Sequence, residues 1–333
     1  MKRVLSGLAA LLVLIALGAG WYVYSKQPTR QGTVELANLQ GSVTVRYDDR
    51  GVPHIRAENE ADLYRALGYV HAQDRLFQME IMRRLAQGEL AEVLGVKLLD
   101  TDKLFRSLRI RERATTYAAQ MDRQSPHWKA LQAYLDGINQ YQDSHAKPVE
   151  FDVLGIAKRP FTAQDTISIA GYMAYSFAVA FRTEPLLTYV RDQLGSDYLK
   201  VFDLDWKPKG DLGLAAADWQ GLSAIARLSE QALADNGLPQ FEGSNAWAIS
   251  GNRTKSGKPL LAGDPHIRFS VPSVWYEAHL SAPGFELYGY HNALVPVAFL
   301  GHNKAFGWSL TMFQNDDFDL IAEKVNPDNL NQV

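Results

Sequence analysis

Ser244, which directly follows Gly243, is the residue of this sequence with the clearest potential for covalent chemistry. One interpretation is an ordinary serine where a loop meets a strand; the other is a point at which the chain cuts itself. A cut before Ser244 would create an N-terminus that carries a hydroxyl nucleophile and a free amine. Because such an amine has a pKa of ~7.7–8.0, part of it is neutral at physiological pH and can act as a base. Gly243 tolerates the strained backbone that self-cleavage needs, but Gly-Ser pairs are common, so the pair alone leaves both interpretations open.

Several other kinds of chemistry are excluded by composition and motifs. The absence of cysteine removes disulfides, thiol catalysis and Cys-ligated metals. The sequence has no G-x-S-x-G, H-E-x-x-H or P-loop motif, and no G-x-G-x-x-G after a strand. A net charge of -3, without a basic stripe, gives no reason to expect a nucleic-acid partner. With 333 residues, 47% of them apolar, the chain is typical of a globular protein with one large or two ordinary domains.

The N-terminus predicts a membrane segment within residues 1–30. Lys2 and Arg3 precede an almost unbroken apolar run over residues 4–24, which ends in aromatic residues that suit a membrane interface. The run is nearer the ~20 residues of a membrane span than the ~7–15 of a signal-peptide core. We therefore expect a single uncleaved anchor, with a cleaved signal as the alternative and a buried core helix as the least favoured interpretation. Either of the first two places residues 31 onward outside the cytoplasm, on the periplasmic side of the inner membrane.

Residues 31–207 are predicted to be mainly helical after an initial hairpin. Alternation over 42–47 and 52–56, with a turn at 48–51, indicates two strands, and Pro53 suggests an edge position or a bulge. Apolar residues at helical spacing predict a helix over 60–87, and further helices are expected at about 101–122 and 126–143. Thr162 with Asp165 is typical of a helix N-terminus. His54 and His71 are interpreted as structural, His71 within a buried hydrogen-bonded network.

The period of the apolar pattern changes to two after a connector at residues 208–243. The connector is rich in small residues, and we interpret it as a surface linker or a removable spacer. Residues 244–333 then alternate as short strands joined by Pro and Gly turns, at about 245–249, 258–262, 274–280, 285–290, 297–300 and 306–311. Helices followed by consecutive strands predict an α+β fold with an antiparallel sheet.

Several separated motifs, in order, resemble the penicillin acylase (penicillin amidase) family of N-terminal nucleophile hydrolases. They are GVPHI at 51–55, GYVHAQDR at 68–75, GSNAW at 243–247, GDPH at 263–266, GHN at 301–303 and DDFD at 316–319. The resemblance spans about residues 40–325. It implies an αββα sandwich of stacked antiparallel sheets and a precursor cut before Ser244. It further implies that the resulting α and β fragments form a heterodimer, with the spacer between them. On this resemblance the sequence looks like a precursor truncated at its C-terminal end.

The resemblance also assigns roles to three residues and implies a hydrolase of linear amides. Ser244 would attack an amide carbonyl and form an acyl-enzyme, while His266 would orient the Ser244 amine. The backbone N–H of Met312 would be the first oxyanion donor; the second donor in the family is an asparagine that falls beyond residue 333. The expected substrate is a small amide, either the side chain of a β-lactam or a fatty-acyl amide such as an acyl-homoserine lactone.

A structural calcium ion is a further implication of the resemblance. The matching ligands are Glu184, Asp316, the carbonyl of Phe318, and Asp319, all hard oxygen donors of the kind that Ca²⁺ prefers. A solvated acidic loop is the alternative for residues 316–319.

The sequence leaves open the role of four aromatic residues and a non-catalytic alternative function. The aromatic residues Trp247, Trp275, Tyr276 and Phe313 could line an acyl pocket, although most are expected in the core. The competing function, from a different class, is a membrane-anchored binding protein that keeps the fold without the chemistry.

Overall fold

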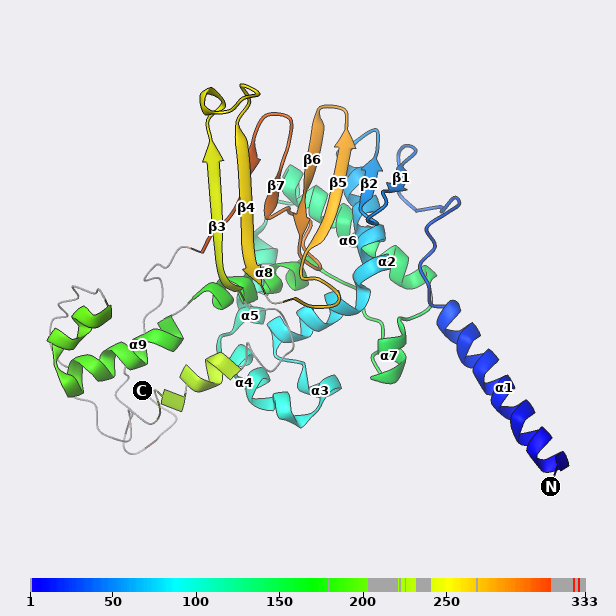
Figure 1. Ribbon diagram of the computed structural model, residues 1–333, viewed down its shortest axis with the longest axis horizontal. Coiled ribbons are helices and arrows are strands. Elements are labelled where there is room, and N and C mark those ends of the chain that lie inside the picture. The colour runs from blue at the N-terminus through cyan, green and yellow to red at the C-terminus, as the bar shows by residue number, and fades with distance from the viewer. Residues whose placement is uncertain are drawn as a thin grey trace.

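The computed structural model describes residues 2–178, 180–202, 221, 223–224, 226–231, 241–267, 269–312, 326 and 329. Helices come first along the chain and most of the strands come later, with the helices packed against one side of the main sheet (Figure 1). This arrangement confirms the predicted α+β class.

Helix α1 (Lys2–Tyr24) projects from the body of the molecule (Figure 1). Residues Leu5–Tyr24 have a mean hydropathy of 1.9 and none of this stretch is buried. The helix is therefore long and apolar enough to cross a membrane, and a signal sequence would meet the same criterion. At its end, the Tyr22 hydroxyl and the Lys26 ammonium both donate to the Asp152 carboxylate, at 2.6 and 2.7 Å.

The larger sheet has six strands in the order β1-β2-β5-β6-β7-β8. The strands are β1 (Thr44–Tyr47), β2 (Pro53–Arg56), β5 (Tyr276–Ala282), β6 (Phe285–His291), β7 (Leu300–His302) and β8 (Gly307–Trp308). All pairings are antiparallel, as predicted, except β2–β5, which is parallel. A parallel pairing needs a long crossover, and here the helices lie between the two strands in sequence. Pro53 is the first residue of β2, which lies between β1 and β5, so the prediction of an edge position or a bulge was wrong. Proline is tolerated at the first residue of a strand, where its missing N–H costs no hydrogen bond of the sheet.

A layer of helices packs on the buried face of this sheet. Helix α2 (Glu60–Gln87) matches the prediction: Asn59 caps its start, and Gly88, at φ 66°, ends it in the left-handed region. Helix α6 (Pro126–Ser144) crosses α2 where Gly68 of α2 and Gly137 of α6 lie against the partner backbone. A Cβ on Gly68 would lie 1.9 Å from the carbonyl oxygen of Tyr134, so the backbones meet at a distance that only glycine permits.

Of the remaining predicted helices, one starts as expected and another is divided in two. Helix α8 (Ala163–Phe177) starts with the predicted capping box between Thr162 and Asp165. The helix expected at 101–122 is instead two helices, because Arg109 adopts φ 54° and breaks the chain direction. The helices are α3 (Ala91–Leu94), α4 (Leu99–Ser107), α5 (Ile110–Gln120), α7 (Val149–Val153) and α9 (Ala180–Tyr189), with short turns at Val96–Leu98, Val190–Leu194, Ser196–Phe202 and Gly251–Arg253.

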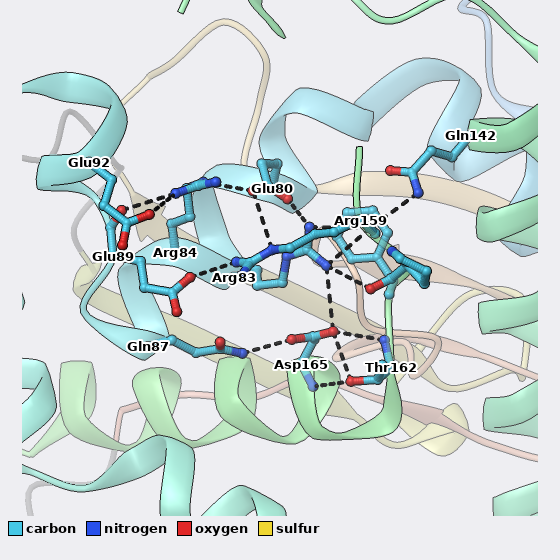
Figure 2. Close-up of polar contacts among 12 residues, drawn as sticks. Glu80, Arg83, Arg84, Gln87, Glu89, Glu92, Gln142, Arg159, Thr162 and Asp165 are labelled. Atoms are coloured by element: carbon cyan, nitrogen blue, oxygen red, sulfur yellow. Dashed lines mark hydrogen bonds and ion pairs between the residues drawn. The ribbon is translucent and has the colours of Figure 1, made fainter. Parts of the chain in front are cut away.

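A buried network of charged side chains joins α2 to the start of α8 (Figure 2). Glu80 is fully buried and accepts from both Arg83 and Arg84, the latter at 2.7 Å. Asp165 accepts from Gln87 at 2.7 Å and lies 3.6 Å from the Arg83 guanidinium. The charges compensate one another, as buried ions must. Nothing in the sequence pattern predicted this network.

The smaller sheet is a hairpin of β3 (Phe241–Ile249) and β4 (Leu260–Ile267), which stands beside the larger sheet (Figure 1). Its register pairs Ser244 with Pro265 and Gly243 with His266. Several of its large apolar side chains are exposed, namely Trp247, Ile249, Leu260 and Leu261. This hairpin holds Ser244 and His266, two of the residues that the sequence singled out for chemistry.

Candidate active site

Ser244 and His266 lie on neighbouring strands of the β3–β4 hairpin. Because Gly243 is paired with His266, a Cβ on Gly243 would lie 3.4 Å from His266 Nδ1. Side chains alternate along a strand, so His266 shares a face with Gly243 while Ser244 points to the other face. The His266 ring therefore lies against the peptide that precedes Ser244, not against the Ser244 hydroxyl. This placement suits a group that orients the Ser244 nitrogen.

Met312 completes the set of three predicted residues. Its backbone N–H donates to the Ser244 Oγ, with 3.0 Å between nitrogen and oxygen. The segment that carries Met312 comes close to β4, because a Cβ on Gly263 would lie 1.9 Å from the hydroxyl oxygen of Ser309. Gly263 thus lets residues 309–312 approach the hairpin and bring a backbone donor to the Ser244 hydroxyl.

Two polar residues that sequence reasoning did not assign surround His266. The Asn245 amide Nδ2 lies 3.1 Å from His266 Nε2, and Asp264 Oδ2 lies 3.3 Å from the same nitrogen. Asp264 also accepts from the backbone N–H of Asn245, at 3.1 Å. Positions 245 and 264 face each other across the hairpin, two residues from the pair 243 and 266 and on the same face, so only the register of the hairpin reveals their role. These three contacts hold the His266 ring and Asn245, the residue that follows Ser244, in fixed positions.

The aromatic candidates separate into core and surface. Tyr276 is buried, and its hydroxyl donates to Asp74 at 2.9 Å. Trp275 packs near Tyr290, with ring centroids 6.4 Å apart, whereas Trp247 is exposed on β3. Phe313 lies outside the described residues. The core interpretation is confirmed for Tyr276.

Both histidines interpreted as structural have ring partners. His71 is fully buried, stacks on Tyr276 at 4.1 Å and lies 2.9 Å from the Tyr134 hydroxyl, which confirms the predicted buried network. His54 looked isolated in sequence, but it meets His279 across the β2–β5 pairing.

The predicted calcium ligands are only partly within the described residues. Glu184 lies on α9 and is half-buried, whereas Asp316, Phe318 and Asp319 fall in the part of the chain that is not described. Within the described ranges, no group of three or more His, Asp or Glu side chains converges as a metal site would. The calcium site therefore stays a prediction.

Comparison with known proteins decides the family of this chain. The penicillin amidase family profile matches residues 42–333. The chain belongs to the penicillin amidase family. The match begins just before β1, so it covers the hairpins, the helical layer and all three site residues, and it leaves α1 outside.

Individual relatives are 28–32% identical to this chain. An acyl-homoserine lactone acylase, QuiP, of Pseudomonas fluorescens is 32% identical over 319 residues, covering 92% of this chain and 38% of that protein. A penicillin acylase 2 proenzyme of a Pseudomonas species is 32% identical over 316 residues, covering 90% and 40%. The penicillin G acylase of Escherichia coli is 28% identical over 338 residues, covering 84% and 40%. The chain thus spans 38–40% of the length of these relatives.

A penicillin G acylase is among the solved structures that match this chain. A thermostable penicillin G acylase from Alcaligenes faecalis shares 27% identity and a TM-score of 0.40, covering 54% of this chain and 98% of that one.

Proposed function

We propose that this protein is an amidohydrolase that cleaves small linear amides with Ser244, after the chain is cut between Gly243 and Ser244. The observation that carries the proposal is the hydrogen bond from the Met312 N–H to the Ser244 hydroxyl, at 3.0 Å. Membership of the penicillin amidase family supports the reaction class. A relative named as a proenzyme supports the cut.

The proposed cut is an intramolecular acyl shift. Ser244 Oγ attacks the carbonyl carbon of Gly243, and the peptide C–N bond breaks as the ester C–O bond forms. Water then hydrolyses the ester, which leaves a carboxylate on Gly243 and a free amine on Ser244. The half-buried Gly243 offers no Cβ to obstruct the attack, and the nearest side-chain atom to that position is His266 Nδ1.

The proposed turnover uses the new N-terminus as nucleophile and base. Oγ attacks the substrate amide carbon while the Ser244 amine takes the hydroxyl proton; the Met312 N–H stabilises the oxyanion that develops. The substrate C–N bond breaks, the leaving amine takes the proton, and water hydrolyses the acyl-enzyme. One backbone donor of this type is worth ~10²–10³ in rate. His266, Asp264 and Asn245 act by holding the terminal residue in position.

Processing, location and the metal complete the proposal. After the cut, the α fragment, which ends at Gly243, and the β fragment of residues 244–333 stay together as a heterodimer; release of residues 208–243 as a spacer requires a second hydrolysis after residue 207. Helix α1 anchors the protein on the periplasmic side of the inner membrane, or serves as its export signal. Glu184, Asp316, Asp319 and the Phe318 carbonyl would hold a structural calcium ion through oxygen donors.

The substrate class follows from the names of relatives. Those names include acyl-homoserine lactone acylase and penicillin acylase, so we propose a fatty-acyl amide or a β-lactam side chain. Release of amine from a panel of amides, varied in chain length and aromatic character, distinguishes the two.

Mass spectrometry of the full-length gene product tests the function. We expect a fragment that begins at Ser244, and we expect Ser244→Ala to abolish both the cut and amide hydrolysis. Ser250→Ala, an exposed serine just after β3, is the matched control and should be cut normally. An intact wild-type chain without amidase activity would sink the proposal and favour a non-catalytic binding protein.

A further inference from the structure

His54 of β2 and His279 of β5 meet on the face of the six-stranded sheet that points away from the helices. Their Nδ1 atoms are 2.9 Å apart, and the rings are nearly perpendicular, at 86°. The adjacent residues Ile55 and Leu280 point the other way and are buried in the core, with 1% and 0% exposed. The backbone register therefore fixes both imidazoles side by side on the accessible face.

The second nitrogen of each ring faces a carboxylate. His54 Nε2 lies 3.8 Å from Asp48 Oδ2, and His279 Nε2 lies 3.7 Å from Glu286 Oε1. Histidines that bind metals usually direct one nitrogen at the ion and the other N–H at a carboxylate or carbonyl, which fixes the tautomer. Here a carboxylate lies near the second nitrogen on each strand, at an ion-pair distance that is longer than a direct hydrogen bond.

We propose that His54 and His279 form a two-histidine site for a divalent transition-metal ion such as Zn²⁺. With metal–nitrogen bonds of ~2.0–2.1 Å, two nitrogens lie ~2.9 Å apart at a right angle and ~3.3 Å apart at a tetrahedral angle. The observed 2.9 Å is at one end of that range. When both Nδ1 atoms bind the ion, both protons reside on Nε2, the nitrogen that lies nearer to Asp48 in one ring and to Glu286 in the other.

The surroundings select the type of ion. A cavity of about 720 Å³ opens beside the pair and leaves space for water molecules to complete the coordination. Arg46 and Arg56 line the same cavity, and their positive charge opposes any cation that is held by charge alone. Imidazole nitrogen bonds well to Zn²⁺, Ni²⁺ and Cu²⁺, and poorly to Ca²⁺ and Mg²⁺. The site should therefore discriminate against hard cations.

The ion would join two segments that are distant in sequence. His54 precedes the Gly243–Ser244 bond and His279 follows it, so a bound ion fastens β2 to β5 whether or not the chain is cut. A ligand that binds only the folded state raises its stability, so Zn²⁺ should raise the Tm.

Titration of the purified full chain with Zn²⁺ alone, after treatment with EDTA, tests this inference. Calorimetry should show binding that a hundredfold excess of Ca²⁺ does not displace, together with an increase in Tm. His54→Ala and His279→Ala should each weaken binding by at least ~10-fold and remove the Tm increase, since each deletes one of two protein ligands. His302→Ala, on the same sheet, and His266→Ala, on the hairpin, are the matched controls and should bind as the wild type does.

Two outcomes would overturn the inference: a wild-type chain that does not bind Zn²⁺, or a His54→Ala/His279→Ala double variant that binds it as tightly. His54→Gln covers the case in which the alanine variants fold poorly, because it keeps bulk and a hydrogen-bonding amide while removing the imidazole ligand. Circular dichroism and the metal-free Tm establish that each variant is folded. Ser244→Ala should retain Zn²⁺ binding, so loss of catalysis and loss of this site are separable.

Discussion

The backbone N–H of Met312 donates to the hydroxyl of Ser244, with 3.0 Å between the two atoms. The residues are far apart in sequence, and the contact forms because residues 309–312 pass closely over Gly263 of β4. A donor this close to the hydroxyl oxygen would lie beside the oxyanion that the proposed attack by Ser244 creates.

Removing that donor should reduce the rate of amide hydrolysis. Met312→Pro lacks the N–H, and we expect kcat to fall by ~10²–10³, the usual value of one oxyanion donor. Met312→Leu keeps the N–H and a similar volume, so its kcat should stay within a few-fold of the wild type. Steady-state kinetics on one amide measures both variants. Equal losses in the two would show that the side chain matters and the N–H does not.

His266 should act through position and not as a proton carrier. His266→Ala removes the partner of the Asn245 amide and should lower kcat by ~10², the scale of a displaced reacting group. His266→Gln retains an amide that can accept from Asn245 and should recover most of that loss. If glutamine and alanine were equally impaired across pH 6–9, an acid–base role would replace the positioning role.

The buried ion network predicts a large loss of stability from one neutral substitution. Glu80→Gln leaves the Arg83 and Arg84 guanidinium groups without their shared carboxylate, and breaking a buried pair costs ~3–5 kcal/mol. Asp100→Asn is the control, because its ion pair with Lys103 is mostly exposed and should contribute ~1 kcal/mol or less. Urea unfolding of the full chain gives both free energies. Similar losses of unfolding free energy in the two variants would contradict the large contribution of the buried network to stability.

Buried histidine should make the fold sensitive to mild acid. Burial lowers the pKa of His291 from 6.5 to about 4, because the low-dielectric interior disfavours the charged imidazole. Between pH 6.5 and 4 the unfolded chain binds more protons than the folded chain, so stability falls as pH falls, by about 3 kcal/mol over the window. Burial also lowers the pKa of His71, which adds in the same direction.

Unfolding free energies at pH 7, 5.5 and 4.5 measure this slope. His291→Gln cannot be protonated and should show a shallower dependence than the wild type, with the other acidic groups common to both chains. If the unfolding free energy depended equally on pH in the two proteins, His291 would not be the cause of the acid sensitivity.

Local features of the fold could be predicted from the sequence. The apolar period and the flanking Asn59 and Gly88 determine α2, whose bounds agree with the prediction at both ends. Thr162 and Asp165 form their capping box from residues only three apart. The break at Arg109 was missed because left-handed backbone at an arginine has no composition signal.

Long-range relationships could not be predicted in the same way. The parallel β2–β5 pairing and the contacts of Arg83 with Asp165 depend on how helices return the chain to the sheet. Motif resemblance supplied Ser244, His266 and Met312 as a set. Asp264 was overlooked although it lies in the same motif as His266, because its carboxylate has a role only when the hairpin register places it beside Asn245.

The pairing of β2 with β5 also decides how this protein can be assembled. Its sheet is built from residues on both sides of the Gly243–Ser244 bond, so the intact chain completes the sheet in a unimolecular reaction. If that bond is cut as proposed, two denatured pieces would first have to find each other, and refolding would become a second-order process that depends on their concentration. We therefore expect the proposed cut to follow folding and not to precede it.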